Sequence, residues 1–271
     1  MNKTSEISVK HFEMYLFSME KSKATIEKYS RDVKRFLEYL GDQNMEKDIV
    51  IGFKQYLVNS NYSTRSINSM LASVNSFLDF YGRKDCRVKF LKYQKQTYMV
   101  EDKELTKADY MNLLAAAENI QLKLIIQTIC ATGIGVSELK YITVKAVRKG
   151  EAIISCKGKN RVIFIPTKLK KYLLAFIKDS RIKDGPVFVS KKGAPLDRSY
   201  IWRKMKELCV KAKVPKEKVF PHNLRKLFAR TFYKEEKDIS KLADVLGHSN
   251  IETTRIYIMT TSNEHRKKLI D

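Results

Sequence analysis

Apolar residues recur at helical spacing along the first part of the chain. Between positions 22 and 41 they fall on one face of a 3.6-residue period, and a glycine then ends the pattern. Residues 63–82 repeat apolar positions at alternating steps of four and three, again up to a glycine. Shorter helical patterns cover 6–20 and 44–59. These patterns predict a module of four helices.

The second part of the chain is mostly helical, with one clear change of period. Helical patterns cover 107–118 and 120–131. Within 151–166, β-branched residues lie on either side of a Lys-Gly-Lys-Asn turn, which is typical of a β-hairpin, and the later pattern returns to helix. The predicted fold is therefore mainly α, with a small β-hairpin sheet in the second part.

A basic segment separates the two parts. It lacks a clean period, so we assign residues 84–104 to a basic linker between an N-terminal domain (1–83) and a C-terminal domain (105–271). Such a segment can lie along a phosphate backbone. The alternative is an ordinary solvated loop.

The charge balance indicates a polyanionic partner. The chain has 53 Lys and Arg against 30 Asp and Glu, a net charge of +23. Neutralised phosphates release counterions, so nucleic acid is the simplest partner for this charge. The alternative is a basic protein that does not bind nucleic acid. The outer faces of the predicted N-terminal helices carry candidate DNA-binding residues, namely Lys28, Arg31, Lys34 and Arg65.

Cysteine usage and hydropathy predict a soluble, cytoplasmic protein. No two cysteines form a CxxC pair, which favours reduced thiols over disulfides or structural zinc. The N-terminus lacks the apolar stretch of a signal peptide, and no apolar run has the length of a membrane span. We therefore expect no membrane association.

Three stretches of the second part could carry chemistry. In PHNLRKLFAR, His222 and Arg225 are three residues apart and share one helix face, where they can bind a phosphate and exchange a proton with it. In LADVLGHSNIETTRIYI, His248 follows a glycine that ends a helix, and Tyr257 lies nine residues further on. Lys157 stands at the hairpin tip. Taken singly, each has an ordinary explanation: a half-buried histidine, a core tyrosine or a solvated lysine.

Taken together, these stretches resemble the signature of the tyrosine site-specific recombinases, the phage integrase family. HxxR is followed about twenty residues later by LGHSxxxTTxxY, and TGxxVSEL at 132–139 resembles the family's upstream box. The resemblance covers residues from about 105 to 271, and the four-helix module resembles the family's core-binding, SAM-like domain. The chain is most similar to short, two-domain integrases that are related to the Xer recombinases and carried by mobile elements.

The resemblance implies an enzyme that cuts and rejoins DNA strands. Tyr257 would attack a phosphodiester and form a 3′-phosphotyrosyl link, which a second 5′-hydroxyl then attacks. Arg225 would bind the phosphate as its charge grows. His222 would assist proton transfer from the tyrosine, and His248 would donate a further hydrogen bond.

The resemblance also implies a general acid and partners. Lys157 would protonate the leaving 5′-oxygen, with Lys159 as the nearby alternative and as a DNA contact. No metal or other cofactor is implied. The expected partners are a double-stranded recombination site and further copies of the chain, which form a homotetramer in the synaptic complex.

One position departs from the family's pattern. The upstream box normally reads TGxRxSEL, and here Gly135 takes the place of the arginine. Losing one such donor costs about 2.7–4 kcal/mol, or about 10²–10³ in rate. Lys140 points to a different helix face and Arg148 lies beyond that helix, so neither is expected to replace it. We therefore expect a recombinase whose cleavage is impaired.

Two other functions remain as alternatives. Gly135 also fits a catalytically inactive DNA-binding protein that occupies or regulates recombination sites. The five intact positions favour the enzyme, because binding alone requires none of them. A type IB topoisomerase shares the chemistry, but the chain length and the four-helix module argue against it.

Overall fold

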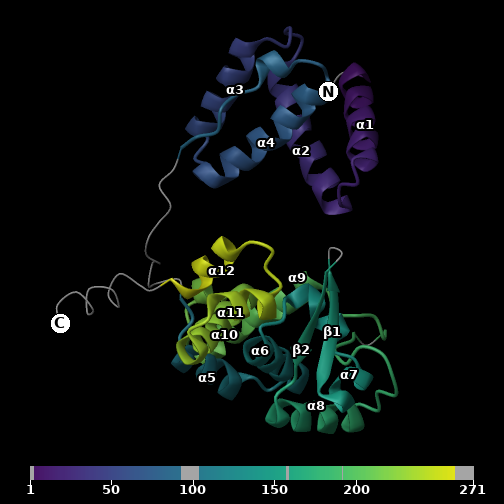
Figure 1. The fold of residues 1–271 in the computed structure, drawn as a ribbon, viewed down its shortest axis with the longest axis vertical. Helices are drawn as coiled ribbons and strands as arrows, with labels where there is room; N and C mark the ends of the chain where they lie inside the picture. Colours follow the sequence, from purple (N-terminus) through teal and green to yellow (C-terminus); the bar gives the residue numbers. More distant parts are fainter. Residues whose placement is uncertain (1–2, 93–103, 157–158, 191, 260–271) are drawn as a thin grey trace, which may run out of the picture. The chain divides into compact units, whose positions relative to one another are not determined.

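The structure is a computed structural model that describes residues 3–92, 104–156, 159–190 and 192–259. Contacts within the chain divide it into two compact units, residues 1–95 and 96–271 (Figure 1). Among the described residues, no helix combines the length and the apolar character that crossing a bilayer requires.

Four helices build the first unit, as the apolar periods predicted. α2 and α4 pack along each other, and α1 contacts both. Ser22 caps α2 by accepting a hydrogen bond from the backbone N–H of Thr25, and Ser63 caps α4 in the same way. Every helix contributes a phenylalanine to the core, namely Phe12, Phe36, Phe53 and Phe77. The elements are α1 (Lys3–Ser18), α2 (Lys23–Leu40), α3 (Lys47–Asn59), α4 (Thr64–Phe80) and the 3₁₀ helix η1 (Lys84–Cys86).

The segment that follows α4 packs on the first unit. The side chain of Asn75 donates to the carbonyl oxygen of Val88 (2.9 Å) and accepts from its N–H (3.0 Å). Asn68 holds the backbone of Leu91 by the same pair of hydrogen bonds. Val88 and Leu91, in the segment that the sequence assigned to a linker, are therefore fixed to α4 by two amide side chains. The rest of the expected linker, up to residue 103, lies outside the described residues.

The second unit is a helical body with one hairpin. α6 contacts α8, α9 and α10, and the helices predicted over 107–118 and 120–131 are α5 and α6 (Figure 1). The predicted hairpin is the antiparallel pair β1–β2, in which Ile154 lies opposite Arg161. The elements are α5 (Lys107–Ala116), α6 (Ile120–Thr132), η3 (Val136–Tyr141), α7 (Val144–Lys149), β1 (Glu151–Cys156), β2 (Lys159–Phe164), α8 (Thr167–Asp179), α9 (Arg198–Ala212), η4 (Lys216–Lys218), α10 (Pro221–Glu236), α11 (Ile239–Leu246) and α12 (Ile251–Ile258).

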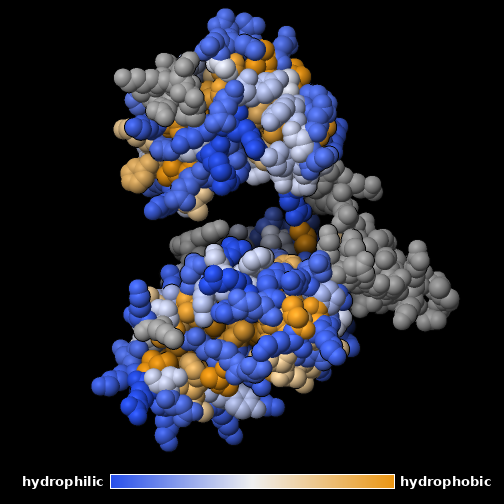
Figure 2. Space-filling view, turned by 180° about the vertical axis from the view of Figure 1, so that it is seen from behind, coloured by the Kyte–Doolittle hydropathy of each residue, from blue (hydrophilic) through white to orange (hydrophobic). Residues whose placement is uncertain are grey.

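The last three helices form a small core of their own. α11 and α12 pack on each other and on α10, and the fully or largely buried side chains between them are Ala229, Leu242, Leu246 and Tyr257. Pro221 occupies the first turn of α10, where its missing N–H costs nothing. Hydrophilic side chains cover much of the face of each unit that Figure 2 shows, with apolar side chains between them.

Candidate active site

Tyr257 on α12 stands at the centre of a cluster of polar side chains. Its hydroxyl lies 3.2 Å from Nδ1 of His222. Its ring meets the rings of His222 and His248 edge to face, at centroid distances of 4.9 and 4.8 Å. The tyrosine is buried, and burial raises its pKa although the charge of Arg225 opposes this. The phenol is therefore protonated at neutral pH and needs a base to react.

His222, in the first turn of α10, can serve as that base. The residue reaches solvent. Partial desolvation of its ring by the surrounding protein, together with the positive charges of Lys226, Arg225 and Arg198, lowers its pKa to about 4. The imidazole is thus neutral at pH 7, and an unprotonated Nδ1 can accept the phenol proton of Tyr257.

His248 follows Gly247, whose φ of +69° ends α11 in the left-handed conformation. Its Nδ1 lies 2.9 Å from the hydroxyl of Thr254, and its Nε2 lies 3.5 Å from a guanidinium nitrogen of Arg225. Partial burial and the charges of Arg225 and Arg161 lower the pKa of His248 to about 4. Thr254 is fully buried, so it fixes the orientation of the ring.

Arg225 on α10 is held by the backbone of two other elements. It donates to the carbonyl oxygen of Gly133 at 2.6 Å, just after α6, and to that of Leu246 at the end of α11. Its side chain is only 12% exposed, and burial lowers its pKa. These contacts fix the guanidinium beside Tyr257, and they join three segments that are distant in the sequence.

Gly135 lies beside the same cluster, at the start of η3. Its φ of −75° and ψ of 149° are open to any residue, so the backbone does not require glycine there. Its N–H donates to Oε2 of Glu138 at 2.7 Å. A Cβ added at Gly135 would lie 2.9 Å from that oxygen. A side chain at this position would therefore begin against the carboxylate of Glu138.

Two residues in this cluster were not identified as site residues from the sequence. Glu138 is buried, which opposes its ionisation, but hydrogen bonds from Arg161 and Gly135 outweigh burial and lower its pKa. Arg161 on β2 donates to both carboxylate oxygens of Glu138, at 3.0 and 2.7 Å. A signal for Arg161 exists in the sequence: it alternates with Ile163 and Ile165 on the inward side of the strand, where a charge is unusual.

The remaining predicted residues lie elsewhere or outside the described part. Lys157 lies outside the described residues, and only the backbone of Lys159 is described, at the start of β2. In the first unit, Arg31, Lys34 and Arg65 are exposed. Lys28 is half-buried, because it forms an ion pair with Asp32 at 2.7 Å and also donates to the carbonyl oxygen of Ser69 and the hydroxyl of Ser73.

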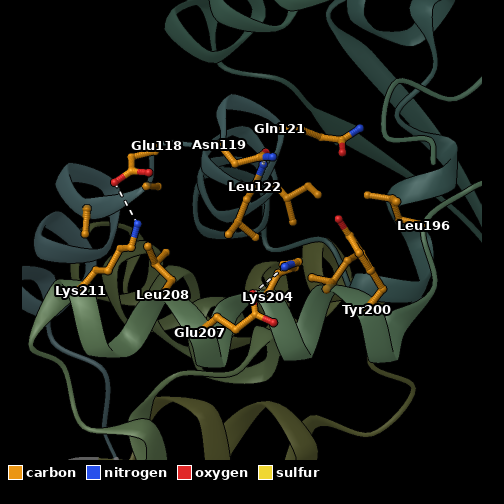
Figure 3. A pocket seen from close by; sticks show the side chains of 14 residues that line it. Glu118, Asn119, Gln121, Leu122, Leu196, Tyr200, Lys204, Glu207, Leu208 and Lys211 are labelled. Carbon is orange, nitrogen blue, oxygen red and sulfur yellow. Dashed lines mark hydrogen bonds and ion pairs between the residues drawn. The ribbon is translucent and has the colours of Figure 1, made fainter. Parts of the chain in front are cut away.

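A hollow in the second unit shares no residue with the cluster. It lies between the start of α6 and the length of α9, and an ion pair between Lys211 and Glu118 crosses it at 3.0 Å (Figure 3). Leu122 and Leu208 line it together with charged side chains of α9. None of the predicted site residues that the structure describes lines it, so we assign it no part in the chemistry.

Two family patterns match the chain. The pattern described as "Phage integrase family" matches residues 103–264, and "Phage integrase, N-terminal SAM-like domain" matches residues 9–85. The chain belongs to the phage integrase family of tyrosine recombinases. The cluster around Tyr257 lies within the first matched region.

Xer recombinases are among the relatives that match most of the chain. Tyrosine recombinase XerA of Thermococcus kodakarensis is 30% identical over 276 residues, which is 98% of this chain and 95% of that protein. Tyrosine recombinase XerD of Oceanobacillus iheyensis is 27% identical, over 88% of each chain. A crystal structure of XerA recombinase matches 97% of this chain and 96% of its own with a TM-score of 0.55 at 25% identity. A lambda integrase dimer bound to a COC′ core site shares the fold, with a TM-score of 0.75 at 17% identity over 93% of this chain and 94% of that one.

Proposed function

We propose that this integrase binds a duplex recombination site and breaks and rejoins its strands through a 3′-phosphotyrosyl link to Tyr257. The single observation that carries the proposal is the 3.2 Å contact between the Tyr257 hydroxyl and Nδ1 of His222, with Arg225 and His248 in the same cluster. A tyrosine kept only for packing would need neither a base nor a buried guanidinium beside its hydroxyl.

The steps follow from the chemistry of these groups. As the Tyr257 oxygen bonds to phosphorus, its proton passes to neutral His222. The bond from phosphorus to the 5′-oxygen breaks, and Lys157, which follows β1 in the sequence, would supply the proton that this oxygen takes up. Arg225 and His248 donate to the non-bridging oxygens, whose negative charge grows in the transition state. A 5′-hydroxyl of a second strand then reverses these steps, so bond energy is conserved and no cofactor is consumed.

The proposed partners are duplex DNA and further copies of this chain. The net charge of +23 supports a polyanionic partner. Solved structures with this fold include a lambda integrase dimer on a core site and a lambda integrase tetramer on a Holliday junction. We propose that this chain likewise assembles as a homotetramer on two duplexes, with Arg31, Lys34 and Arg65 of the first unit contacting phosphates.

Gly135 is the residue that favours the second candidate function, DNA binding without cleavage. With glycine at the position of the box arginine, the chain could bind recombination sites without cutting them, or cut them slowly. This alternative keeps the DNA partner and removes the covalent step, so one assay separates the two.

The test is covalent trapping. A target duplex is first selected by binding from a pool with a randomised segment. The target is then nicked near the cleaved position, so that cleavage releases a short fragment. Without that fragment the reaction cannot reverse, and the phosphotyrosyl adduct accumulates. We expect an SDS-resistant adduct with the wild-type chain and none with Tyr257→Phe, which should still bind the duplex. Tight binding by both proteins without an adduct would establish the binding-only function instead.

A further inference from the structure

Two guanidinium groups share one carboxylate, and one of them, that of Arg225, acts on the hydroxyl of Tyr257. Arg161 meets Oε2 of Glu138 at 2.7 Å, and Arg225 meets the same oxygen at 3.6 Å. Among the described residues, Glu138 is the carboxylate with which each of these arginines forms its ion pair. All three side chains are at most 14% exposed. Two cations and one anion leave this buried group with one net positive charge.

Net positive charge away from water is costly unless an anion can join it. The two histidines nearby have pKa values of about 4 and are neutral at pH 7, so they add no charge, and no carboxylate other than Glu138 pairs with either arginine in the described ranges. The Nε of Arg161 is buried and has no hydrogen-bond partner in the structure. A phosphate that enters the cluster would supply the missing negative charge.

Arg161 binds the carboxylate that a side chain at position 135 would meet first. A Cβ on Gly135 would be 2.9 Å from Oε2 of Glu138 and 3.7 Å from a guanidinium nitrogen of Arg225. The carboxylate oxygen at that point is the one that Arg161 binds. An arginine at position 135 would thus start next to the group that Arg161 already occupies.

Gly247, which directly precedes His248, leaves room for the side chain of Arg161. A Cβ on Gly247 would lie 2.5 Å from Nη1 of Arg161 and 2.9 Å from its Cδ and Cζ. The guanidinium therefore packs directly on the backbone that leads into His248. Arg225 binds the carbonyl oxygen of the residue before that glycine. Both arginines therefore pack on the short stretch of backbone that ends at His248.

We propose that Arg161, supplied by β2, is the second guanidinium of the phosphate-binding site and replaces the arginine that the family's box places at position 135. The proposal rests on the proposed function of Tyr257. When the Tyr257 oxygen bonds to phosphorus and the bond to the 5′-oxygen breaks, the charge of Arg161 stabilises the non-bridging oxygens. Cleavage then proceeds although position 135 is glycine.

The first experiment compares two substrates in each protein. The selected duplex carries either a phosphodiester or an uncharged methylphosphonate at the cleaved position. Arg161→Met should slow adduct formation on the phosphodiester by about 10²–10³-fold and on the methylphosphonate by less than about tenfold, because the neutral group needs less charge stabilisation. The ratio is taken within one protein preparation, so a partly unfolded variant does not mimic the effect.

Two further variants separate charge from geometry. Arg161→Lys keeps the positive charge but cannot donate a bidentate pair of hydrogen bonds. It should lose less activity on the phosphodiester than Arg161→Met. Arg148→Ala removes an exposed arginine outside the cluster and should cleave both substrates like the wild type. Equal losses on both substrates for Arg161→Met, or no loss on either, would overturn the proposal.

A swap of the two positions tests the replacement directly. Gly135→Arg alone should not accelerate cleavage, because its side chain starts against a carboxylate that Arg161 holds. Gly135→Arg combined with Arg161→Met should recover at least about tenfold of the activity that Arg161→Met loses. A large gain from Gly135→Arg alone would show that the second guanidinium is absent from the wild-type chain.

A binding measurement keeps this proposal separate from the proposed function. On a Tyr257→Phe background, methylphosphonates are scanned along the selected duplex. Neutralising the bound phosphate should weaken binding several-fold when Arg161 is present and much less with Arg161→Met. If the wild-type protein forms no adduct, the proposed covalent function is wrong. If Arg161→Met leaves the loss of binding at each methylphosphonate unchanged, the proposed role of Arg161 is wrong, whatever the adduct assay shows.

Discussion

The hydroxyl of Tyr257 lies 3.2 Å from Nδ1 of His222, although 35 positions separate the two residues in the chain. α12 brings the tyrosine and the first turn of α10 brings the histidine, and the small apolar core between the last helices sets their separation. The proposed nucleophile and its proposed base therefore lie within hydrogen-bond distance of each other in a single chain.

His222 should be needed for the proton that Tyr257 loses. We expect His222→Gln to slow adduct formation by about 10²–10⁴-fold, because general-base catalysis is lost while the fold is kept. The measurement is the single-turnover rate on a nicked duplex, with the thermal midpoint of unfolding as the control. An unchanged rate would show that another group takes the proton.

His222 and His248 should both titrate near pH 4 in the free protein. Their folded-state pKa of about 4 lies below the ordinary 6.5, so the folded state binds fewer protons than the unfolded state between these values. Stability is therefore full above about pH 6.5 and falls as the pH drops toward 4. NMR titration of the imidazole signals checks this, with single substitutions assigning each of the 4 histidines.

Bound DNA should raise both values, because a phosphate favours the imidazolium form. Titration of the Tyr257→Phe protein with and without the selected duplex measures the difference. Midpoints that stay near 6.5 in the free protein would contradict the burial and the positive surroundings of both rings.

Thr254 should support cleavage by orienting the ring of His248. Its hydroxyl contacts Nδ1 of the ring at 2.9 Å and is buried, so Thr254→Val keeps the shape and removes the hydrogen bond. We expect adduct formation to slow by about tenfold or more, while DNA affinity stays within about twofold. Thr253→Val, at the exposed neighbouring position, is the matched control and should behave as wild type.

Gly247 should be required for two separable reasons. Its left-handed φ of +69° costs alanine about 1–2 kcal/mol, and a Cβ would overlap the side chain of Arg161. Gly193 has a φ of +79° with nothing within 4 Å, so Gly193→Ala carries only the first cost. Urea unfolding should show a loss of stability for both variants, larger for Gly247→Ala, and only Gly247→Ala should also slow cleavage. Equal cleavage rates would mean that Arg161 moves aside freely.

The exposed basic residues of the first unit should act through phosphate contacts. We expect Arg31→Gln to weaken binding to every duplex and to reduce the slope of log K against log salt by about one. Lys28→Met should instead destabilise the first unit, because Lys28 pairs with buried Asp32 and contacts Ser73. Chemical unfolding and salt-dependent binding of both variants test the distinction.

The sequence predicted the architecture because its periods are local. The capped helices of the first unit and the Lys-Gly-Lys-Asn hairpin follow from spacing and turn chemistry within a few residues. The packing of residues 84–92 was not predicted, since side-chain hydrogen bonds from Asn68 and Asn75 hold that basic segment and hydropathy does not register them.

The sequence by itself also determined the chemical inventory of the second unit: a tyrosine, two histidines and an arginine in a fixed order, with glycine at position 135. Only the tertiary structure decided what fills the place of the absent arginine. Arg161 is 26 positions from Gly135 on a different element, and no local pattern links them. The hairpin packs against η3, and this packing brings the guanidinium of Arg161 to Glu138. The same carboxylate accepts the backbone N–H of Gly135.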